Sequence, residues 1–402
     1  MKKLFISILY CLLLGFFILS CSSDNNPVSP DEKQFDQETV TKLETALDES
    51  LREFNVPGVI AGIWSPKGNF VKAKGVSNLT TGEPMRVDNH FRMGSVTKTF
   101  VGTVVLMLVD EGKIRLDSTL AKYLPEYKFP KADKITLRML GNMTSGIFNY
   151  TNDKDWAKDC AYKNWDISFT ADSLVKIGLK HPLNFEPGTQ YEYSNTNTIL
   201  LGLICEKVTG KPIYKLLEEK IFIPQALKNT YWPHNVYIAT PYSHGYTRGT
   251  VGNVLTDATN FNFSWGGSAG ILISNIYDLK KWVKLLNSGS LYSPAMHTER
   301  LKWANGSNSV YGFAIMNAGD EKTLILGHTG GVWGFNTYAV HLPSKDLTII
   351  ISVNFYGGTT DMPANSVFEK ILKIVTPELF NSAQLKIWSN VKNSSKDILP
   401  LL

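Results

Sequence analysis

The order of the predicted elements constrains the fold of this chain more than any other feature, because strands open and close it while helices fill the middle. A strand at 59–64, turn residues at 66–69 and a returning strand from Phe70 form the pattern of a hairpin. Four further strands are predicted near the other end, at 310–315, 323–326, 337–341 and 347–353. We therefore predict an α+β fold, an α/β sandwich whose antiparallel sheet is built from both chain ends and flanked by helices, with an inserted all-helical subdomain.

Hydrophobic periodicity predicts the helices around this sheet. The clearest are 34–54, the apolar run from Phe100 to Val109, 198–209, 276–286 and 363–374. The region from about 115 to 270 is mainly helical and rich in loops. The chain after about Thr376 carries no clear pattern, and no internal repeat is visible.

The first 20 residues have the composition of a signal peptide, with Lys2 and Lys3 before an apolar stretch that ends at Leu19. Cys21 follows directly, and this ending resembles a bacterial lipoprotein signal, in which the cysteine becomes the lipidated first residue. The alternative is an ordinary signal peptide with an incidental cysteine. We expect an exported bacterial lipoprotein, held to a membrane of the cell envelope by acyl chains on Cys21, on the periplasmic side or the cell surface.

These signals divide the chain into four parts. Residues 1–20 are the lipoprotein signal peptide, 21–34 a flexible tether, 35–376 a single globular domain and 377–402 a C-terminal tail.

Charge and cysteine content narrow the function. The formal charge of +5 falls to +3 without Lys2 and Lys3, and no basic stripe with interleaved aromatic residues is present, so we expect no nucleic-acid partner. Cys160 and Cys205 remain after the leader and Cys21 are set aside, as a disulfide or as two buried free thiols. No metal-ligand spacing occurs, so we predict no metal and no cofactor.

Ser95 and Lys98 form the strongest candidate for catalytic chemistry. They lie three residues apart at the start of the apolar run, where they would share a helix face, so the amine can reach the hydroxyl. A serine hydroxyl needs such a neighbouring base to act as a nucleophile, and a helix N-terminus favours an oxyanion. The Ser-x-x-Lys pattern also occurs at 173–176 and 389–392, so the surroundings of Ser95 carry the assignment.

Two further motifs supply the remaining groups of an acyl-transfer site. Tyr193 and Asn195 lie in a polar loop after a Pro-Gly turn and just before a helix, although Tyr-x-Asn also occurs at 150–152 and 162–164. The single run His328-Thr329-Gly330-Gly331 is predicted at the end of the 323–326 strand, where glycines allow a substrate to approach the backbone.

In their order, these motifs resemble the serine beta-lactamase and penicillin-binding superfamily, in its class C beta-lactamase and D-alanyl-D-alanine carboxypeptidase branch. The resemblance covers about residues 38 to 375. It rests on the blocks 91–98, 110–117, 135–140 with 144–146, 193–197, Trp265 with 268–270, and 327–331.

The resemblance implies a role for each matching residue. Ser95 would be acylated, Lys98 would take or relay its proton, and Tyr193 would act with Lys98 as general base or acid. Substrate binding would fall to Asn195, to the strand of His328, Thr329, Gly330 and Gly331, and to Trp265, for which a core position is the alternative. The backbone N–H groups of Ser95 and Gly331 would form the oxyanion hole.

Two departures from the family pattern shift the expected substrate. His328 stands where class C beta-lactamases usually carry lysine, and histidine is familiar in the carboxypeptidase, D-aminopeptidase and esterase members. Because histidine titrates near neutrality, we expect activity to depend on pH through His328. Lys322 is the only cation between Lys302 and His328, which counts against recognition of a free terminal carboxylate by an arginine on the preceding strand.

The sequence therefore predicts a serine hydrolase that forms an acyl-enzyme at Ser95. The expected reaction is that of a D-alanyl-D-alanine carboxypeptidase-like, D-stereospecific peptidase. The alternatives are an esterase or amidase with the same machinery, or a penicillin-binding sensor without turnover. Expected partners are small peptide or ester substrates and beta-lactam antibiotics.

Overall fold

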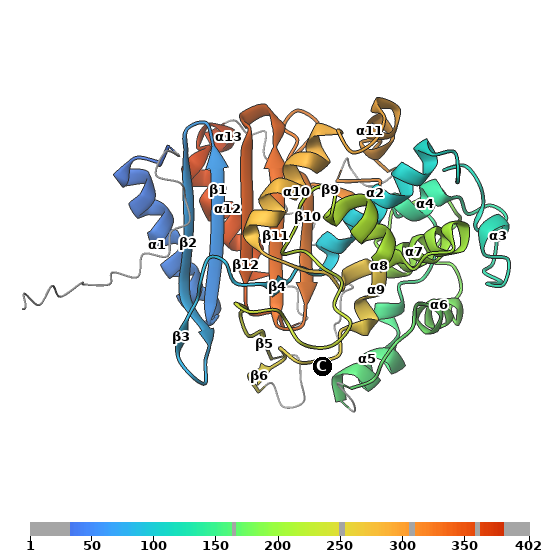
Figure 1. The fold of residues 1–402 in the computed structure, drawn as a ribbon, viewed down its shortest axis with the longest axis horizontal. Helices are drawn as coiled ribbons and strands as arrows, with labels where there is room; N and C mark the ends of the chain where they lie inside the picture. The colour runs from blue at the N-terminus through green and yellow to red at the C-terminus, as the bar shows by residue number, and fades with distance from the viewer. Residues whose placement is uncertain (1–32, 163–165, 249–253, 305–309, 358–361, 382–402) are drawn as a thin grey trace, which may run out of the picture.

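An eight-stranded antiparallel sheet forms the centre of the fold, in the order β3-β2-β1-β12-β11-β10-β9-β8 (Figure 1). The computed structural model describes residues 33–162, 166–248, 254–304, 310–357 and 362–381. The strands of this sheet are β1 (Gly58–Ser65), β2 (Gly68–Asn78), β3 (Glu83–Pro84), β8 (Tyr311–Gly312), β9 (Ile315–Asn317), β10 (Leu326–Val332), β11 (Phe335–Leu342) and β12 (Leu347–Val353).

The two ends of the chain meet in this sheet, as predicted. β1 pairs with β12 in the register Val59 to Val353, so the N-terminal hairpin extends the C-terminal strands. Smaller pairs join β4 (Phe91–Arg92) to β7 (Ile273–Ser274) and β5 (Tyr246–Thr247) to β6 (Thr256–Asp257). The β4–β7 pair lies directly before the predicted nucleophile.

The helices cover both faces of the sheet and extend beyond its β8 edge (Figure 1). The longer ones are α1 (Gln37–Phe54), α2 (Thr97–Asp110), α5 (Lys154–Tyr162), α6 (Ala171–Leu179), α7 (Asn195–Thr209), α10 (Ile276–Ser288) and α12 (Pro363–Val375). The shorter ones are α3 (Leu120–Tyr123), α4 (Leu137–Gly141), α8 (Ile213–Leu217), α9 (Gly267–Gly270), α11 (Pro294–Arg300) and α13 (Glu378–Asn381). Single 3-10 turns include η1 (Gly94–Val96), η2 (Tyr150–Asn152) and η5 (Ser264–Gly266).

Alternating side chains of the central strands supply two hydrophobic cores, because successive residues of a strand point to opposite faces. Ile349 and Ile351 of β12 face α1 and α12, where Leu47 and Phe368 are also fully buried. Ile350 faces the other way, into the larger core that contains α10 and the helical region. The sheet is therefore buried on both faces, as in the predicted α/β sandwich.

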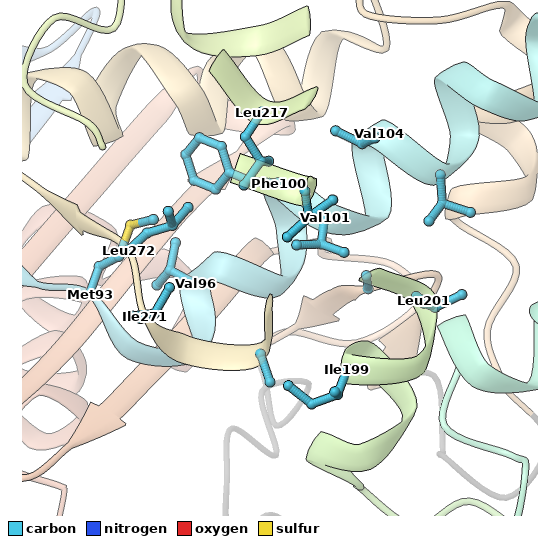
Figure 2. Packing of buried hydrophobic residues seen from close by; sticks show 14 of the residues in the cluster. Met93, Val96, Phe100, Val101, Val104, Ile199, Leu201, Leu217, Ile271 and Leu272 are labelled. Carbon is cyan, nitrogen blue, oxygen red and sulfur yellow. The ribbon is translucent and has the colours of Figure 1, made fainter. Parts of the chain in front are cut away.

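The interior helix of the helical region is α2, which begins two residues after Ser95. Figure 2 shows Phe100, Val101 and Val104 of this helix packed among Ile199, Leu201 and Leu217 from neighbouring helices. Phe100 also stacks on Trp282 of α10, with ring centroids 3.8 Å apart. This packing buries α2 among the neighbouring helices, as the apolar run predicted.

Two predicted strands differ in the structure. The 310–315 segment is a short hairpin, β8–β9, because the backbone N–H groups of Phe313 and Ala314 donate to Arg300 and Gly141 rather than to a neighbouring strand. The 323–326 strand begins only at its last residue, since the Asp320 carboxylate accepts hydrogen bonds from the backbone of Lys322 and Thr323 and holds them in a turn.

Several predictions fall outside the described residues. They include the signal peptide, the lipidation at Cys21, almost all of the tether and most of the tail. Gln34, which the sequence assigned to the tether, pairs with Asn69 at the start of β2. Within the described ranges, no helix combines the length and the apolar character needed to cross a bilayer.

Candidate active site

Ser95 lies in the 3-10 turn η1, immediately before α2. The preceding strand is anchored by its pairing with β7 and by a hydrogen bond from the Met93 N–H to the Leu272 carbonyl. Gly94 then turns the chain with a φ of 55°, in the left-handed region that favours glycine. Ser95 is partly exposed, whereas Lys98, one turn further, is fully buried. The nucleophile is therefore accessible and its base is shielded from water.

The Lys98 amine is surrounded by three oxygens. Its Nζ lies 3.0 Å from Ser95 Oγ, 2.7 Å from Asn195 Oδ1 and 2.7 Å from the Ala269 carbonyl. A neutral amine has two N–H donors and one lone pair. Asn195 and Ala269 can accept the two N–H bonds, which leaves the lone pair for the Ser95 hydroxyl. The predicted contact between the two residues is present, with the geometry needed for proton transfer.

The surroundings of Lys98 favour this neutral form. Burial lowers the pKa of Lys98 well below its ordinary value of 10.5, because removal from water destabilises the ammonium ion. Both polar partners besides Ser95 are neutral groups, and the Tyr193 ring lies 4.9 Å from Nζ. The site therefore provides a base near the nucleophile without a carboxylate or a histidine.

Tyr193 completes the proton-handling group, with its ring beside the Lys98 amine. Burial raises the pKa of the phenol far above 10, and a hydrogen bond with the Ser95 side chain acts in the opposite direction. The phenol is thus protonated in the resting site, which favours Lys98 as the proton acceptor and Tyr193 as the group that relays a proton.

Asn195 is the first residue of α7 rather than part of the loop before it. Besides accepting a hydrogen bond from Lys98, its side chain donates to Thr151 Oγ1 at 3.2 Å, and its backbone N–H donates to Asn149 Oδ1 at 3.0 Å. These bonds fix the amide with its oxygen toward the lysine. Asn195 therefore orients Lys98, a role in addition to the substrate contact that the sequence suggested.

His328, Thr329, Gly330 and Gly331 lie inside β10, not at the end of a strand as predicted. The strand runs on to Val332, and Thr329 and Gly330 pair with Tyr338 and Thr337 of β11. Gly330 and Gly331 continue the antiparallel pairing of β10 with β11, because β11 pairs with β10 from Leu326 to Val332. The motif thus presents a strand edge to the site.

The expected titration of His328 near neutrality is contradicted. His328 is 2% exposed, and burial together with the nearby Lys98 lowers its pKa to about 3. Its Nδ1 lies 2.6 Å from the carbonyl oxygen of Thr329, and its Nε2 lies 3.1 Å from the Tyr311 hydroxyl. The ring is therefore a neutral, fully bonded element of the pocket wall at physiological pH.

The predicted oxyanion hole would lie where β10 meets η1. A Cβ placed on Gly94 would lie 2.8 Å from the backbone nitrogen of Gly331, and one placed on Gly330 would lie 2.0 Å from the Met93 carbonyl oxygen. Only glycines allow the strand and the nucleophile turn to approach this closely. The Ser95 and Gly331 backbones are thus brought to the same place, as two donors to one oxyanion require.

Trp265 lies in η5, in a row of aromatic side chains. Its ring centroid is 5.5 Å from that of Trp333, in the turn after β10, and 5.6 Å from that of Trp156 on α5. The Tyr150 hydroxyl donates to its backbone carbonyl at 2.5 Å. Trp265 is partly exposed, so it is neither a fully buried core residue nor a free surface one.

The alternative copies of the catalytic motifs have structural roles. Ser173 donates and accepts hydrogen bonds with Thr170 in the capping box of α6, and Lys176 pairs with Asp172 on the helix surface. Tyr150 of the second Tyr-x-Asn motif is buried against Trp265. The copies at 389–392 and around 163 fall outside the described residues or in part outside them.

Three groups were missed by sequence reasoning. They are the Ala269 carbonyl that binds Lys98, the Thr151 hydroxyl that holds Asn195, and the Tyr311 hydroxyl that bonds His328. Ala269 and Thr151 lie within or beside blocks that the sequence had singled out. Tyr311 carried no signal beyond its place in a predicted strand.

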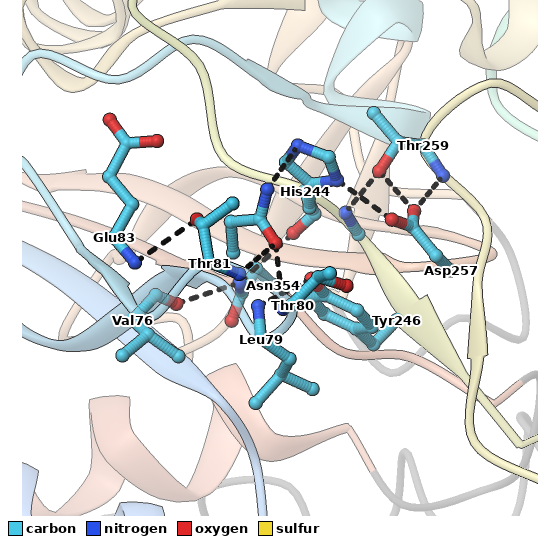
Figure 3. A network of polar contacts seen from close by, with 12 residues as sticks. Val76, Leu79, Thr80, Thr81, Glu83, His244, Tyr246, Asp257, Thr259 and Asn354 are labelled. Carbon is cyan, nitrogen blue, oxygen red and sulfur yellow. Dashed lines mark hydrogen bonds and ion pairs between the residues drawn. The ribbon is translucent and has the colours of Figure 1, made fainter.

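A polar network around His244 and Asp257 joins the surface hairpin β5–β6 to the end of β2 (Figure 3). His244 lies 2.7 Å from Asp257 through Nδ1 and 3.0 Å from the Asn78 amide through Nε2. Asp257 accepts a hydrogen bond from the backbone N–H of Thr259, whose carbonyl accepts one from the buried Arg92. Arg92 belongs to β4, so this network supports the base of the site.

Other candidate chemistry is limited. Cys205 is a buried free thiol, and the Cys160 side chain falls outside the described residues, so the pairing left open by the sequence is not formed at Cys205. Among the residues that the structure describes, no group of His, Cys, Asp and Glu side chains could hold a metal ion.

This arrangement, a partly exposed serine with a buried amine and a phenol beside a strand edge, is that of an acyl-transfer site. The family model described as Beta-lactamase matches residues 42–371, and the chain belongs to this family. The resemblance inferred from the sequence is confirmed.

Several individual proteins that are similar to this chain have names that refer to D-amino-acid chemistry. The chain is 27% identical over 312 residues to a D-aminopeptidase of Brucella anthropi, covering 76% of this chain and 57% of that relative's length. It is also similar to the crystal structure of a D-stereospecific amidohydrolase from Streptomyces sp., with 28% identity, a TM-score of 0.73, and coverage of 83% and 97% of the two chains. The D-amino acid amidase of Ochrobactrum anthropi SV3, solved with D-phenylalanine, has a TM-score of 0.74 at 24% identity, covering 85% and 99%, and shares the fold.

Proposed function

We propose that this protein hydrolyses amide bonds of D-amino-acid substrates through an acyl-enzyme at Ser95. The observation that carries the proposal is the buried Lys98 amine 3.0 Å from Ser95 Oγ, with a pKa depressed by burial. A neutral amine in this position accepts the hydroxyl proton as Oγ attacks the substrate carbonyl.

The reaction then proceeds in two steps, acylation of Ser95 and hydrolysis of the acyl-enzyme. The Ser95 Oγ–C bond forms, the Ser95 proton passes to Lys98, and the carbonyl oxygen takes the negative charge beside the N–H groups of Ser95 and Gly331. When the tetrahedral intermediate collapses, the scissile bond breaks and Tyr193 relays a proton from Lys98 to the leaving amine. In the second step water attacks the acyl carbonyl and gives one proton to the same groups. The Oγ–C bond then breaks, that proton returns to Ser95 Oγ, and the acid is released.

The substrate class rests on the relatives. D-aminopeptidase and D-stereospecific amidohydrolase relatives favour a D-configured acyl group. The chain spans 57% of the length of the Brucella anthropi D-aminopeptidase. Release of D-alanine from a D-alanyl-D-alanine terminus is the carboxypeptidase form of the same reaction. Ester hydrolysis and stable acylation without turnover are the other outcomes that the site chemistry allows.

A matched pair of serine variants tests the proposal. Turnover of D- and L-aminoacyl amides, a D-alanyl-D-alanine peptide and short esters is measured for the wild type, Ser95→Ala and Ser173→Ala. We expect the wild type and Ser173→Ala to prefer the D-amides and Ser95→Ala to lose turnover. Ser173 is the control because it has the same Ser-x-x-Lys pattern on the α6 surface. Equal turnover by Ser95→Ala, or a preference for L-substrates, would contradict the proposal.

We also propose that the mature protein is anchored to a membrane of the cell envelope through lipid on Cys21. The support is the sequence from Lys2 to Cys21 alone. Labelled palmitate should be incorporated into the full chain expressed in a bacterium but not into a Cys21→Ser variant. Equal labelling of the two would contradict the anchor.

A further inference from the structure

Tyr311 and His328 form a closed hydrogen-bonded pair beside the nucleophile. The Nδ1 atom of His328 lies 2.6 Å from the Thr329 carbonyl oxygen, which can only accept a hydrogen bond. Nδ1 therefore carries the proton, and Nε2 is left as the acceptor. The Tyr311 hydroxyl lies 3.1 Å from Nε2 and donates to it. Both ring nitrogens are thus occupied within the protein.

The groups around this pair leave no stabilisation for an imidazolium ion. His328 and Tyr311 are 2% and 1% exposed. Facing His328 are the Lys98 amine from α2, the Tyr193 ring at 6.2 Å and the Tyr311 ring at 5.8 Å. The Lys98 amine supplies no negative charge, and burial keeps both phenols protonated. No acid is among these facing groups.

The pair lies on the side of Ser95 where the leaving group would receive its proton. The Ser95 side chain influences the Tyr193 phenol, and the Tyr193 ring centroid lies 6.0 Å from that of Tyr311 and 6.2 Å from that of His328. A leaving group protonated through Tyr193 would therefore depart past His328. If that group carried a carboxylate, its negative charge would lose water there. The three oxygens around Lys98 already occupy its amine, so Lys98 does not offer a free cation.

We propose that Tyr311 is a positioning residue that donates to Nε2 of His328 and keeps that nitrogen unprotonated, and that the resulting neutral wall selects leaving groups without a carboxylate. Primary amides, amides of blocked amines and esters fit this wall, whereas a free D-amino acid as leaving group does not. This inference rests on the proposed function and narrows its substrate from D-amino-acid compounds in general to those with an uncharged leaving group.

The first test needs only the wild-type protein. The kcat/KM is measured for three substrates that share one D-aminoacyl group: the primary amide, the dipeptide with a free C-terminal carboxylate, and the same dipeptide blocked as its C-terminal amide. We expect the free carboxylate to lower kcat/KM by about 10-fold or more, and the blocked dipeptide to recover most of it. Equal kcat/KM for free and blocked dipeptides would overturn the neutral wall.

The second test addresses Tyr311 itself. Tyr311→Phe keeps the ring and removes the hydroxyl, while Tyr127→Phe removes a phenol that hydrogen-bonds Asp172 away from these contacts and serves as the control. ¹⁵N NMR of labelled histidine should show Nε2 of His328 as an unprotonated, hydrogen-bonded nitrogen in the wild type and Tyr127→Phe, and its resonance should shift when that hydrogen bond is lost in Tyr311→Phe. The preference for uncharged leaving groups should fall about 2-fold to 10-fold in Tyr311→Phe. An unchanged Nε2 resonance with an unchanged preference would overturn the positioning role.

A third variant separates charge from folding. His328→Lys introduces a cation at this wall and should raise the relative kcat/KM for the free dipeptide, which a loss of folding would not do. A fall for all substrates in parallel would count against the inference. If the proposed function itself is wrong, the wild type will turn over no D-substrate and Ser95 will not be acylated. That outcome differs from a changed or unchanged leaving-group preference in an active enzyme.

Discussion

Gly94 provides a quantitative test of how the site is built, because two independent costs oppose a side chain there. Its φ is 55°, and a Cβ would lie 2.8 Å from the Gly331 nitrogen and 3.1 Å from two further backbone atoms of Gly330. Gly210, at the end of α7, has a φ of 70° and nothing within 4 Å of its Cβ position. The pair separates the backbone cost from the steric one.

The expected effects follow from these environments. Gly210→Ala should cost only the left-handed conformation, about 1–2 kcal/mol. Gly94→Ala should cost the same plus about 1–3 kcal/mol for overpacking against a strand that β11 holds in place, so about 2–5 kcal/mol in total. Urea unfolding followed by fluorescence measures both values.

The same substitution should affect chemistry more than the control does. Displacement of the Gly331 N–H would remove one donor of the proposed oxyanion hole, which costs about 10²-fold or more in the acylation rate. Gly210→Ala should acylate at the wild-type rate. If Gly94→Ala were as stable and as active as Gly210→Ala, the close approach of β10 to the nucleophile turn would be refuted.

Two further predictions concern buried basic side chains. Burial depresses the pKa of Lys98, so the unfolded chain binds this proton more tightly than the folded protein does. The free energy of unfolding of the wild type should therefore rise relative to that of Lys98→Met as the pH increases toward 10.5, and fall as the pH is lowered. Parallel curves of stability against pH would contradict a neutral amine. Arg300 is fully buried and donates hydrogen bonds to Thr103, Tyr292 and the Thr99 carbonyl. Arg300→Met should therefore lower the free energy of unfolding by about 2 kcal/mol or more, whereas Arg115→Met, at an exposed position, should change it little. Equal effects of the two substitutions in thermal or urea unfolding would argue against a stabilising role of Arg300.

The sequence allowed the fold to be predicted where periodicity was strong. The β1–β2 hairpin, α2 and β12 follow directly from turn residues and long apolar runs. The β8–β9 hairpin was predicted as one strand, because the hydrogen bonds that divide it go to Arg300 and Gly141, far away in the sequence. Local patterns do not contain such distant partners.

The same distinction holds for the site. Ser95, Lys98, Tyr193 and Asn195 were predicted because their chemistry depends on side-chain type and order, and the structure brings them together. The Ala269 carbonyl is a backbone group that any residue could supply. The charge state of His328 depends on burial and on a phenol from another strand, neither of which a motif specifies.

The most direct test of the central claim is the site of covalent acylation. Wild-type protein, Ser95→Ala and Ser173→Ala are incubated with labelled penicillin and, separately, with a slowly hydrolysed D-aminoacyl ester, and the modified residue is located by peptide mass spectrometry. We predict an acyl adduct on Ser95 in the wild type and in Ser173→Ala, and none in Ser95→Ala. An adduct on another residue, or equal modification of Ser95→Ala, would contradict the assignment of Ser95 as the nucleophile.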